Sequence, residues 1–202
     1  MIGQSTGLRK IAAMKARIRA IQGGQGASKT FSILILIINH ALQNKGKEIF
    51  IASAELSKMR ITVIKDFIKV MHAFNRFNKN CWVDGTLYRF PNGSFIKFIG
   101  LDKEDIGKGL RCDVMFVNEA NKTNFDTYRE LTSRAKLIFI DFNPNKKFWF
   151  HKEVQNRKDC EFLKLTYLDN EFIPENELAE ILLYKEKGYD ADGKLINQYW
   201  AN

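Results

Sequence analysis

Cysteine, proline and histidine are scarce in this sequence, and their scarcity excludes several classes of protein. The chain of 202 residues has three of each. The cysteines, at Cys81, Cys112 and Cys160, are odd in number and far apart, so we expect neither a disulfide framework nor a cysteine-ligated zinc site. The histidines have no partner at the spacing of metal ligands. With 45% hydrophobic and 27% charged residues, the composition is that of a folded globular protein and excludes wholesale disorder.

Long hydrophobic runs are also missing. The longest apolar stretch, residues 31–38, is far shorter than the about 20 residues that a membrane-spanning helix needs. The first seven residues lack the apolar core of a signal peptide. We therefore expect a soluble intracellular protein in a reducing compartment, with no membrane partner. Because Tyr199 and Trp200 place large rings near the last residue, where termini are usually polar, we also expect the intact protein to continue beyond this chain.

Acidic residues are absent from the first 47 positions, where eight Lys and Arg lie. The net charge of +9 is therefore concentrated in that stretch. Such a block favours a polyanionic partner, either nucleotide phosphates or a nucleic-acid backbone. A solvated basic face without a ligand would give the same composition, so charge alone leaves both interpretations open.

Strand-like and helix-like segments alternate along the chain, which predicts an α/β fold with a mostly parallel sheet. The length predicts one domain with a small appendage. Strands are expected at residues 17–22, 47–53, 87–90, 95–99, 114–117, 137–140 and 161–166. Helices are expected at residues 30–43, 57–77, 175–187 and 194–200. A turn signal at residues 91–94 predicts that the strands on either side of it form a β-hairpin.

The strongest motif is an eight-residue segment that matches the phosphate-binding loop G-x-x-x-x-G-K-[ST], except that a serine replaces the second glycine. It consists of Gly23, Gly24, Gln25, Gly26, Ala27, Ser28, Lys29 and Thr30. Small residues let successive backbone N–H groups surround the β-phosphate, Lys29 neutralises the β and γ oxygens, and the Thr30 hydroxyl holds Mg²⁺. We expect all eight residues to bind the nucleotide, and we expect Ser28 to be tolerated as a small substitute. A simple tight turn is the alternative interpretation.

The segment after this loop has the composition of a strand, since residues 31–38 are rich in isoleucine. We nevertheless expect a buried helix there, because the loop requires one whose amino end points at the phosphates.

An apolar strand at residues 114–117 ends in Asn118 and Glu119. In P-loop hydrolases, such a strand ends in an Asp that contacts Mg²⁺ through water, followed by a Glu that activates the attacking water. Here Asn118 is neutral, so we expect it to assist the metal only through a bound water and to leave Mg²⁺ affinity weaker. Asp113 cannot replace the missing charge, because it lies about 16 Å away at the opposite end of the strand, at about 3.3 Å per residue. Glu119 is the candidate general base; an exposed carboxylate without a role is the alternative.

These motifs together resemble the ATPase domain of a tailed-phage large terminase, the motor that pumps DNA into procapsids. The resemblance rests on the order of five segments that cover most of the chain. They are residues 23–30, 108–111, 118–121, 141–144 with Trp149, and 166–170. The resemblance implies an ASCE-type P-loop fold, a mostly parallel central sheet flanked by helices, to which we add the β-hairpin as an insertion. It also implies an Mg²⁺-dependent ATPase with ATP as the fuel.

The resemblance further implies partners and roles. The partners are double-stranded DNA, the portal protein, the small terminase subunit and further copies of the chain in a ring, in the cytoplasm of the infected host. Asn143 is implied as the residue that senses the γ-phosphate and couples hydrolysis to movement; a helix cap before Pro144 is the alternative. Gln25 stands where relatives often have Arg, so Arg111 or Lys108 would act as the arginine finger on a neighbouring subunit, unless Arg111 is only a surface cation beside Asp113.

We expect residues 1–170 to form the ATPase core and residues 171–202 a helical extension toward a nuclease domain that this chain lacks. No carboxylate cluster follows Thr166, so nuclease activity is not expected. Two other functions stay open. One is a helicase-like or recombinase-like ATPase on single strands, and the other is a nucleotide-gated DNA-binding module. A small-molecule kinase fits least, because no arginine-rich lid segment follows the second strand.

Overall fold

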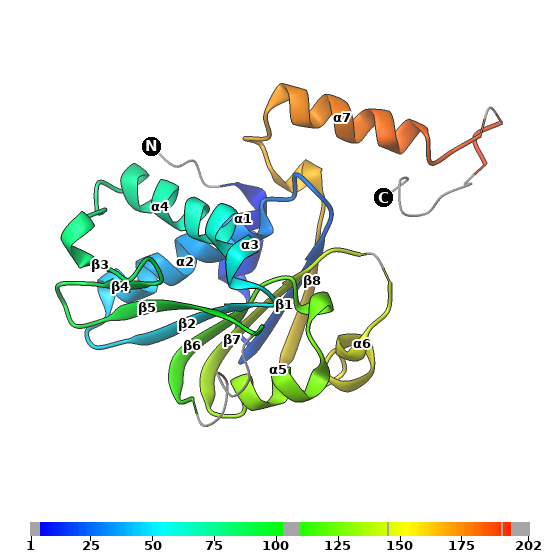
Figure 1. The fold of residues 1–202 in the computed structure, drawn as a ribbon. Helices are drawn as coiled ribbons and strands as arrows, with labels where there is room; N and C mark the ends of the chain where they lie inside the picture. The colour runs from blue at the N-terminus through cyan, green and yellow to red at the C-terminus, as the bar shows by residue number, and fades with distance from the viewer. Residues whose placement is uncertain (1–4, 103–109, 145, 191, 195–202) are drawn as a thin grey trace.

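The protein is described by a computed structural model that covers residues 5–102, 110–144, 146–190 and 192–194 (Figure 1). Its strands are β1 (Ile18–Gly23), β2 (Glu48–Ser53), β3 (Trp82–Val83), β4 (Leu87–Arg89), β5 (Phe95–Gly100), β6 (Cys112–Val117), β7 (Ala135–Phe142) and β8 (Cys160–Leu165). Its α-helices are α1 (Thr6–Ala13), α2 (Lys29–Gln43), α3 (Leu56–Ile61), α4 (Val63–Ala73), α5 (Phe125–Thr132), α6 (Trp149–Glu153) and α7 (Glu175–Glu186). Three short 3₁₀ helices are η1 (Lys79–Cys81), η2 (Ala120–Lys122) and η3 (Tyr167–Asp169).

The strands form one sheet in the order β3-β4-β5-β2-β6-β7-β1-β8. The strand before the phosphate loop, β1, lies between β7 and β8, and all three are parallel. β7 in turn separates β1 from β6, the strand that ends at the Asn118–Glu119 pair. This order is that of the expected ASCE-type P-loop fold. Because all these strands are parallel, their carboxyl ends meet at one edge of the sheet, where ligands of open α/β sheets bind.

The predicted β-hairpin is present as β4 and β5, which pair antiparallel. It does not stand apart from the sheet, however, because β5 also pairs in parallel with β2 over its whole length. The hairpin and the short β3 therefore extend the central sheet at one edge.

Helices cover both faces of the sheet. In Figure 1, α1 to α4 lie over one face, whereas α5 and α6 lie over the other. The two faces have separate hydrophobic clusters: one joins α2 and α4 to residues such as Ile51 and Phe116, and the other joins α5 and α6 to Ile138 and Ile140. Successive strand residues face opposite sides, so strands buried on both faces need the nearly continuous apolar runs seen here. α7 has no buried residue and lies away from the sheet.

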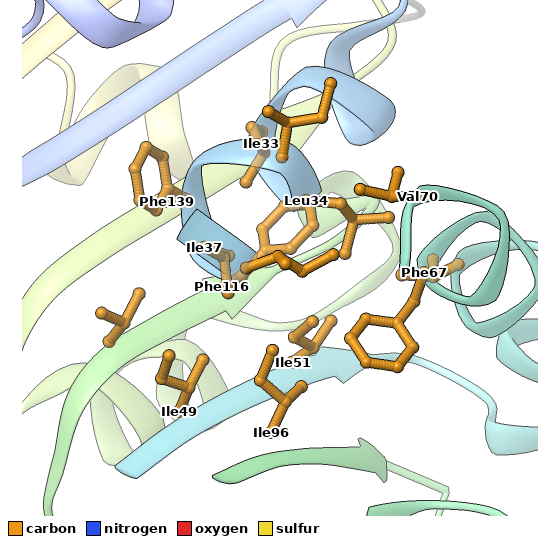
Figure 2. Packing of buried hydrophobic residues seen from close by; sticks show 14 of the residues in the cluster. Ile33, Leu34, Ile37, Ile49, Ile51, Phe67, Val70, Ile96, Phe116 and Phe139 are labelled. Atoms are coloured by element: carbon orange, nitrogen blue, oxygen red, sulfur yellow. The ribbon is translucent and has the colours of Figure 1, made fainter. Parts of the chain in front are cut away.

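The segment with strand-like composition is a helix, as expected from its position after the loop. Figure 2 shows Ile33, Leu34 and Ile37 of α2 packed over the sheet, close to residues such as Ile49 of β2. All four of these side chains are at most 1% exposed. Burial of this side of α2 outweighs the modest helix propensity of isoleucine.

Two other expectations need correction. The helix expected at residues 57–77 is broken at Thr62, whose φ of −118° and ψ of −93° are not helical, so that α3 and α4 are separate. The sequence analysis also missed α1, α5 and α6, which are short. The helix expected at residues 194–200 lies almost wholly outside the described residues. No helix within the described ranges is long and apolar enough to cross a membrane.

Candidate nucleotide-binding site

The phosphate loop connects β1 to α2 at the carboxyl edge of the sheet. Gly23 ends β1, and a Cβ there would lie 2.6 Å from the backbone oxygen of Leu165 in β8, so only glycine fits. Ser28 adopts a left-handed conformation with φ of 48°, which explains why the motif normally has glycine at this position. Serine is accommodated, as expected, but its backbone is strained by about 1–2 kcal/mol.

Lys29 is folded back onto its own loop. Its Nζ donates hydrogen bonds to the carbonyl oxygens of Gly23 at 2.7 Å and Gly24 at 3.0 Å. It also donates to Oδ1 of Asn143 at 3.1 Å. The side chain is only 9% exposed, and burial lowers the pKa of Lys29 while the charges of Asp141 and Glu119 oppose that shift. The structure thus brings together two residues that the sequence analysis placed in different motifs.

Asp141, to which the sequence analysis gave no role, lies at the centre of the site. Thr30 Oγ1 donates to its Oδ2 at 2.5 Å, and the backbone N–H of Glu119 donates to its Oδ1 at 2.7 Å. The amide nitrogen of Asn118 donates to both carboxylate oxygens, at 3.0 and 3.2 Å. Asp141 is 1% exposed, and burial raises the pKa of its carboxyl, against the lowering influence of Lys29 and of these hydrogen bonds.

A signal for Asp141 was present in the sequence. Asn118 and Asp141 are each the first polar residues near the end of an apolar run, and the two runs form adjacent strands in which Val117 pairs with Ile140. The pairing of β6 with β7 was needed to bring the two side chains together.

Glu119 lies at the edge of the site, with a left-handed backbone at φ of 51°. Its carboxylate is 40% exposed and forms an ion pair with Lys122 Nζ at 2.7 Å. It does not contact the phosphate loop. Because an exposed ion pair contributes at most about 1 kcal/mol, Lys122 does not hold this carboxylate firmly. Its role as the general base stays a prediction.

Arg111 lies at the opposite end of the sheet. It directly precedes β6 and lines a pocket of about 590 Å³ together with Asp113, Arg134 and Lys136. The structure therefore separates it from the phosphates of its own chain, as the sequence analysis expected. Lys108, the other candidate, lies outside the described residues.

The basic amino-terminal stretch is partly neutralised by the fold. Lys10 pairs with Asp169 at 2.6 Å, and Arg17 pairs with Asp159 at 3.3 Å. Lys29 is committed to the phosphate loop. The concentration of charge along the sequence is therefore not matched by an equal concentration of free cations.

The segment that follows β8 also contacts the phosphate loop, which the sequence analysis missed. Asn170 Nδ2 donates to the carbonyl oxygen of Gly26 at 2.8 Å. A Cβ at Gly26 would meet Ile173 Cδ1 at 2.6 Å and Ile181 Cδ1, in α7, at 2.7 Å. The predicted boundary at residue 170 therefore falls between two stretches that both touch the same loop.

The polar side chains at this edge fit Mg²⁺. The hydroxyl of Thr30, the amide of Asn118 and the carboxylate of Asp141 present oxygen atoms to one small region. Among the residues that the structure describes, there is no group of three or more His, Cys, Asp or Glu that could hold a metal without further ligands. Mg²⁺ typically uses one or two carboxylates and completes its shell with phosphate oxygens and water, so the set matches that ion in a nucleotide complex.

The sequence and the structure were compared with known proteins. The sequence model of a family described as phage terminase large subunit matches residues 15–194. The chain belongs to this family. No match was found among curated protein sequences.

Solved terminases share the fold. The full-length large terminase of a thermophilic bacteriophage superposes with a TM-score of 0.74 at 15% identity, over 96% of this chain and 52% of that one. The large terminase ATPase domain of Thermus phage P74-26 gives a TM-score of 0.61 at 13% identity, over 92% of this chain and 88% of that one. This terminase chain thus spans about half the length of the first of these proteins, and it has the fold of a terminase ATPase domain.

Proposed function

We propose that this chain is the ATP-hydrolysing motor domain of a phage large terminase and drives translocation of double-stranded DNA into procapsids. The observation that carries the proposal is the hydrogen-bonded network in which the phosphate loop, the end of β6 and the end of β7 meet. The large terminase of the thermophilic bacteriophage has also been solved in complex with ADP and with ATP-gamma-S, which supports nucleotide binding at the corresponding loop. Membership of the terminase family supports the packaging role.

The phosphate loop would hold ATP by charge and by backbone donors. The N–H groups of residues 24–28 and the amino end of α2 face the phosphates, and their dipoles favour negative charge. The γ-phosphate oxygens replace the loop carbonyls as acceptors for Lys29. We include Mg²⁺ in the proposal, since it would neutralise charge on the β- and γ-phosphates, with Thr30 and Asn118 among the residues that hold it.

Glu119 would act as the general base. After leaving Lys122, its carboxylate accepts a proton from a water molecule while the water oxygen bonds to the γ-phosphorus and the bond to the ADP oxygen breaks. Asn143 would report this event, because its Oδ1 shares Lys29 with the phosphates. A change in that hydrogen bond alters the end of β7, a strand in the middle of the sheet.

Arg111 would serve a neighbouring subunit as the arginine finger, because it lies at the wrong end of the sheet to reach its own phosphates. A subunit-mixing experiment tests this role. Arg111→Ala and Lys29→Ala subunits are each inactive alone, but in mixed rings an intact Arg111 of one subunit meets an intact phosphate loop of the next. Recovery of hydrolysis on mixing supports the role, and an inactive mixture whose rings assemble normally refutes it.

The remaining partners belong to the same proposal. They are the portal protein, the small terminase subunit and further copies of the chain in a ring, in the cytoplasm of the infected host. Phosphate release by the full-length large terminase that contains this chain tests the function, with portal and with either duplex or single-stranded DNA. We expect the largest stimulation by duplex DNA.

Two other outcomes would change the proposal. Stronger stimulation by single strands would favour a helicase-like or recombinase-like ATPase. Nucleotide binding without phosphate release would favour a nucleotide-gated DNA-binding module, for which the ion pair between Glu119 and Lys122 is the supporting observation.

A further inference from the structure

Asn118 poses a chemical problem for the proposed site. In P-loop hydrolases, the strand corresponding to β6 ends in an Asp that helps hold Mg²⁺ together with the hydroxyl of the phosphate loop. Asn118 occupies that position and carries no charge. Either the site has lost a charge, or another residue supplies it.

The only acid that the structure joins directly to Thr30 and Asn118 among the described residues is Asp141. It lies one position further along β7 than the residue that pairs with Val117, so it is beside Asn118 at the same edge of the sheet. Its Oδ2 accepts from Thr30 Oγ1 at 2.5 Å, and both oxygens accept from the amide of Asn118. The carboxylate is therefore next to the hydroxyl that the motif assigns to the metal.

The charge of Asp141 is not neutralised by a direct ion pair with any residue that the structure describes. Its hydrogen-bond donors are a hydroxyl, a side-chain amide and a backbone amide, all of them neutral. Lys29, whose charge does act on Asp141, donates its own hydrogen bonds to Gly23, Gly24 and Asn143 instead. Since a buried carboxylate is costly without a cation, this arrangement is that of a site built to receive one.

We propose that Asp141 supplies the carboxylate of the metal site, so that β6 and β7 have exchanged the usual acid and a neutral side chain between their ends. The inference rests on the proposed ATPase function and deepens it. It also replaces the expectation of weak Mg²⁺ binding, which considered Asn118 alone.

Asn118 becomes a positioning residue under this proposal. An ionised carboxylate only accepts hydrogen bonds, so the nitrogen of the Asn118 amide faces Asp141 and the amide oxygen is left as an acceptor. The pair thus presents one charged and one neutral oxygen group, as an Asp on β6 and a neutral residue on β7 would do.

Metal binding with ADP tests the exchange without relying on hydrolysis. Free Mn²⁺ is measured by electron paramagnetic resonance during titration of the full-length protein with ADP present, and ADP binding is measured separately in EDTA. We expect Asp141→Asn to weaken Mn²⁺ binding about 10–100-fold while ADP binding in EDTA is unchanged. Asp113→Asn, the matched change at the other end of the sheet, is expected to leave both values unaltered.

The exchanged double variant, Asn118→Asp with Asp141→Asn, decides the matter. It returns the acid to β6 with the same atoms in the site, and we expect it to recover most of the Mn²⁺ affinity. Wild-type Mn²⁺ affinity in Asp141→Asn overturns the proposal, as does a folded double variant that recovers none. If Asp141→Asn fails to fold, the double variant alone gives the answer. Absence of ADP binding in the wild type would instead refute the proposed function itself.

Discussion

Asp141 and Asp113 lie at opposite ends of the same sheet and are treated by the fold in opposite ways. Asp113, whose side chain is 15% exposed, pairs with Lys136 at 2.9 Å and Lys47 at 3.7 Å. Burial tends to raise the pKa of Asp113, but hydrogen bonds from Lys136 and the Glu48 amide, together with these lysine charges, lower it overall. Asp141 receives only neutral hydrogen-bond donors, and burial raises its pKa.

The contrast separates a structural end of the sheet from a ligand-binding end. At the amino ends of β2, β6 and β7, the protein provides the cations for its own acid. At the carboxyl ends, it buries an acid beside Thr30 without pairing it, and it buries Lys29 against carbonyl oxygens. Charges left without a charged partner in the protein are available to a charged ligand.

The sharpest test of the contrast compares the lysines of the two ends. Lys29→Ala is expected to abolish ATP binding, because it removes the cation that faces the phosphates. Lys136→Ala removes an exposed cation from the other end and is expected to leave binding unchanged. Titration with a fluorescent ATP analogue measures both variants, and similar losses in the two would show that the ends are not functionally distinct.

The carboxylates give the next largest effect. Glu119→Gln is expected to keep ATP binding and to reduce the hydrolysis rate about 10²–10⁴-fold, the usual contribution of a general base. Glu48→Gln, at the amino end of β2, serves as the matched control. The measurement is phosphate release at saturating ATP, and equal turnover in wild type and Glu119→Gln would discard the assignment.

Stability offers a smaller effect at the phosphate end. Gly23→Ala places a Cβ 2.6 Å from the backbone oxygen of Leu165, so β1 and β8 must move, at a cost of about 1–3 kcal/mol in unfolding free energy. Gly24→Ala meets nothing within 4 Å and is expected to change stability much less. Urea unfolding of the two variants compares them directly, and equal stabilities would contradict the close approach of β8 to the loop.

The smallest expected effect is the pH dependence of the Asp113 cluster. Because the pKa of Asp113 is lowered in the folded state, its ion pairs stabilise the fold above the unfolded-state pKa of about 3.9. That stabilisation is lost as the pH falls through the lower, folded-state pKa. Asp113→Asn should therefore be less stable than wild type at pH 7, and the difference should shrink below about pH 4. Thermal unfolding over pH 3–7 measures it, and a constant difference would exclude titration of Asp113 as the cause.

Much of the site was predictable because its signals are local. The loop from Gly23 to Thr30 is contiguous, and its small residues, lysine and threonine have roles that depend on few neighbours. The helical state of residues 31–38 followed from that loop, against the strand propensity of the same residues. The pair Asn118 and Glu119 was found in the same way, from an apolar run that ends in polar residues.

The short helices and the break at Thr62 were not predictable in the same way. α5 and α6 are eight and five residues long, and helices of such length are held by packing instead of by propensity. The 3.6-residue pattern of residues 57–77 continues through Thr62, so periodicity alone gave one helix. The contact of Ile173 and Ile181 with the loop likewise had no local signal.

Local chemistry along the chain was sufficient for the phosphate loop, the alternation of strands and helices and the candidate base, since each depends on neighbouring residues. The folded arrangement was needed to join Asp141 to Thr30 across 111 positions, and Asn143 to Lys29 across 114 positions. Both contacts exist because β7 lies between β1 and β6, and that order arises from the burial of whole strands under helices on both faces. No stretch of sequence shorter than the sheet itself contains that information.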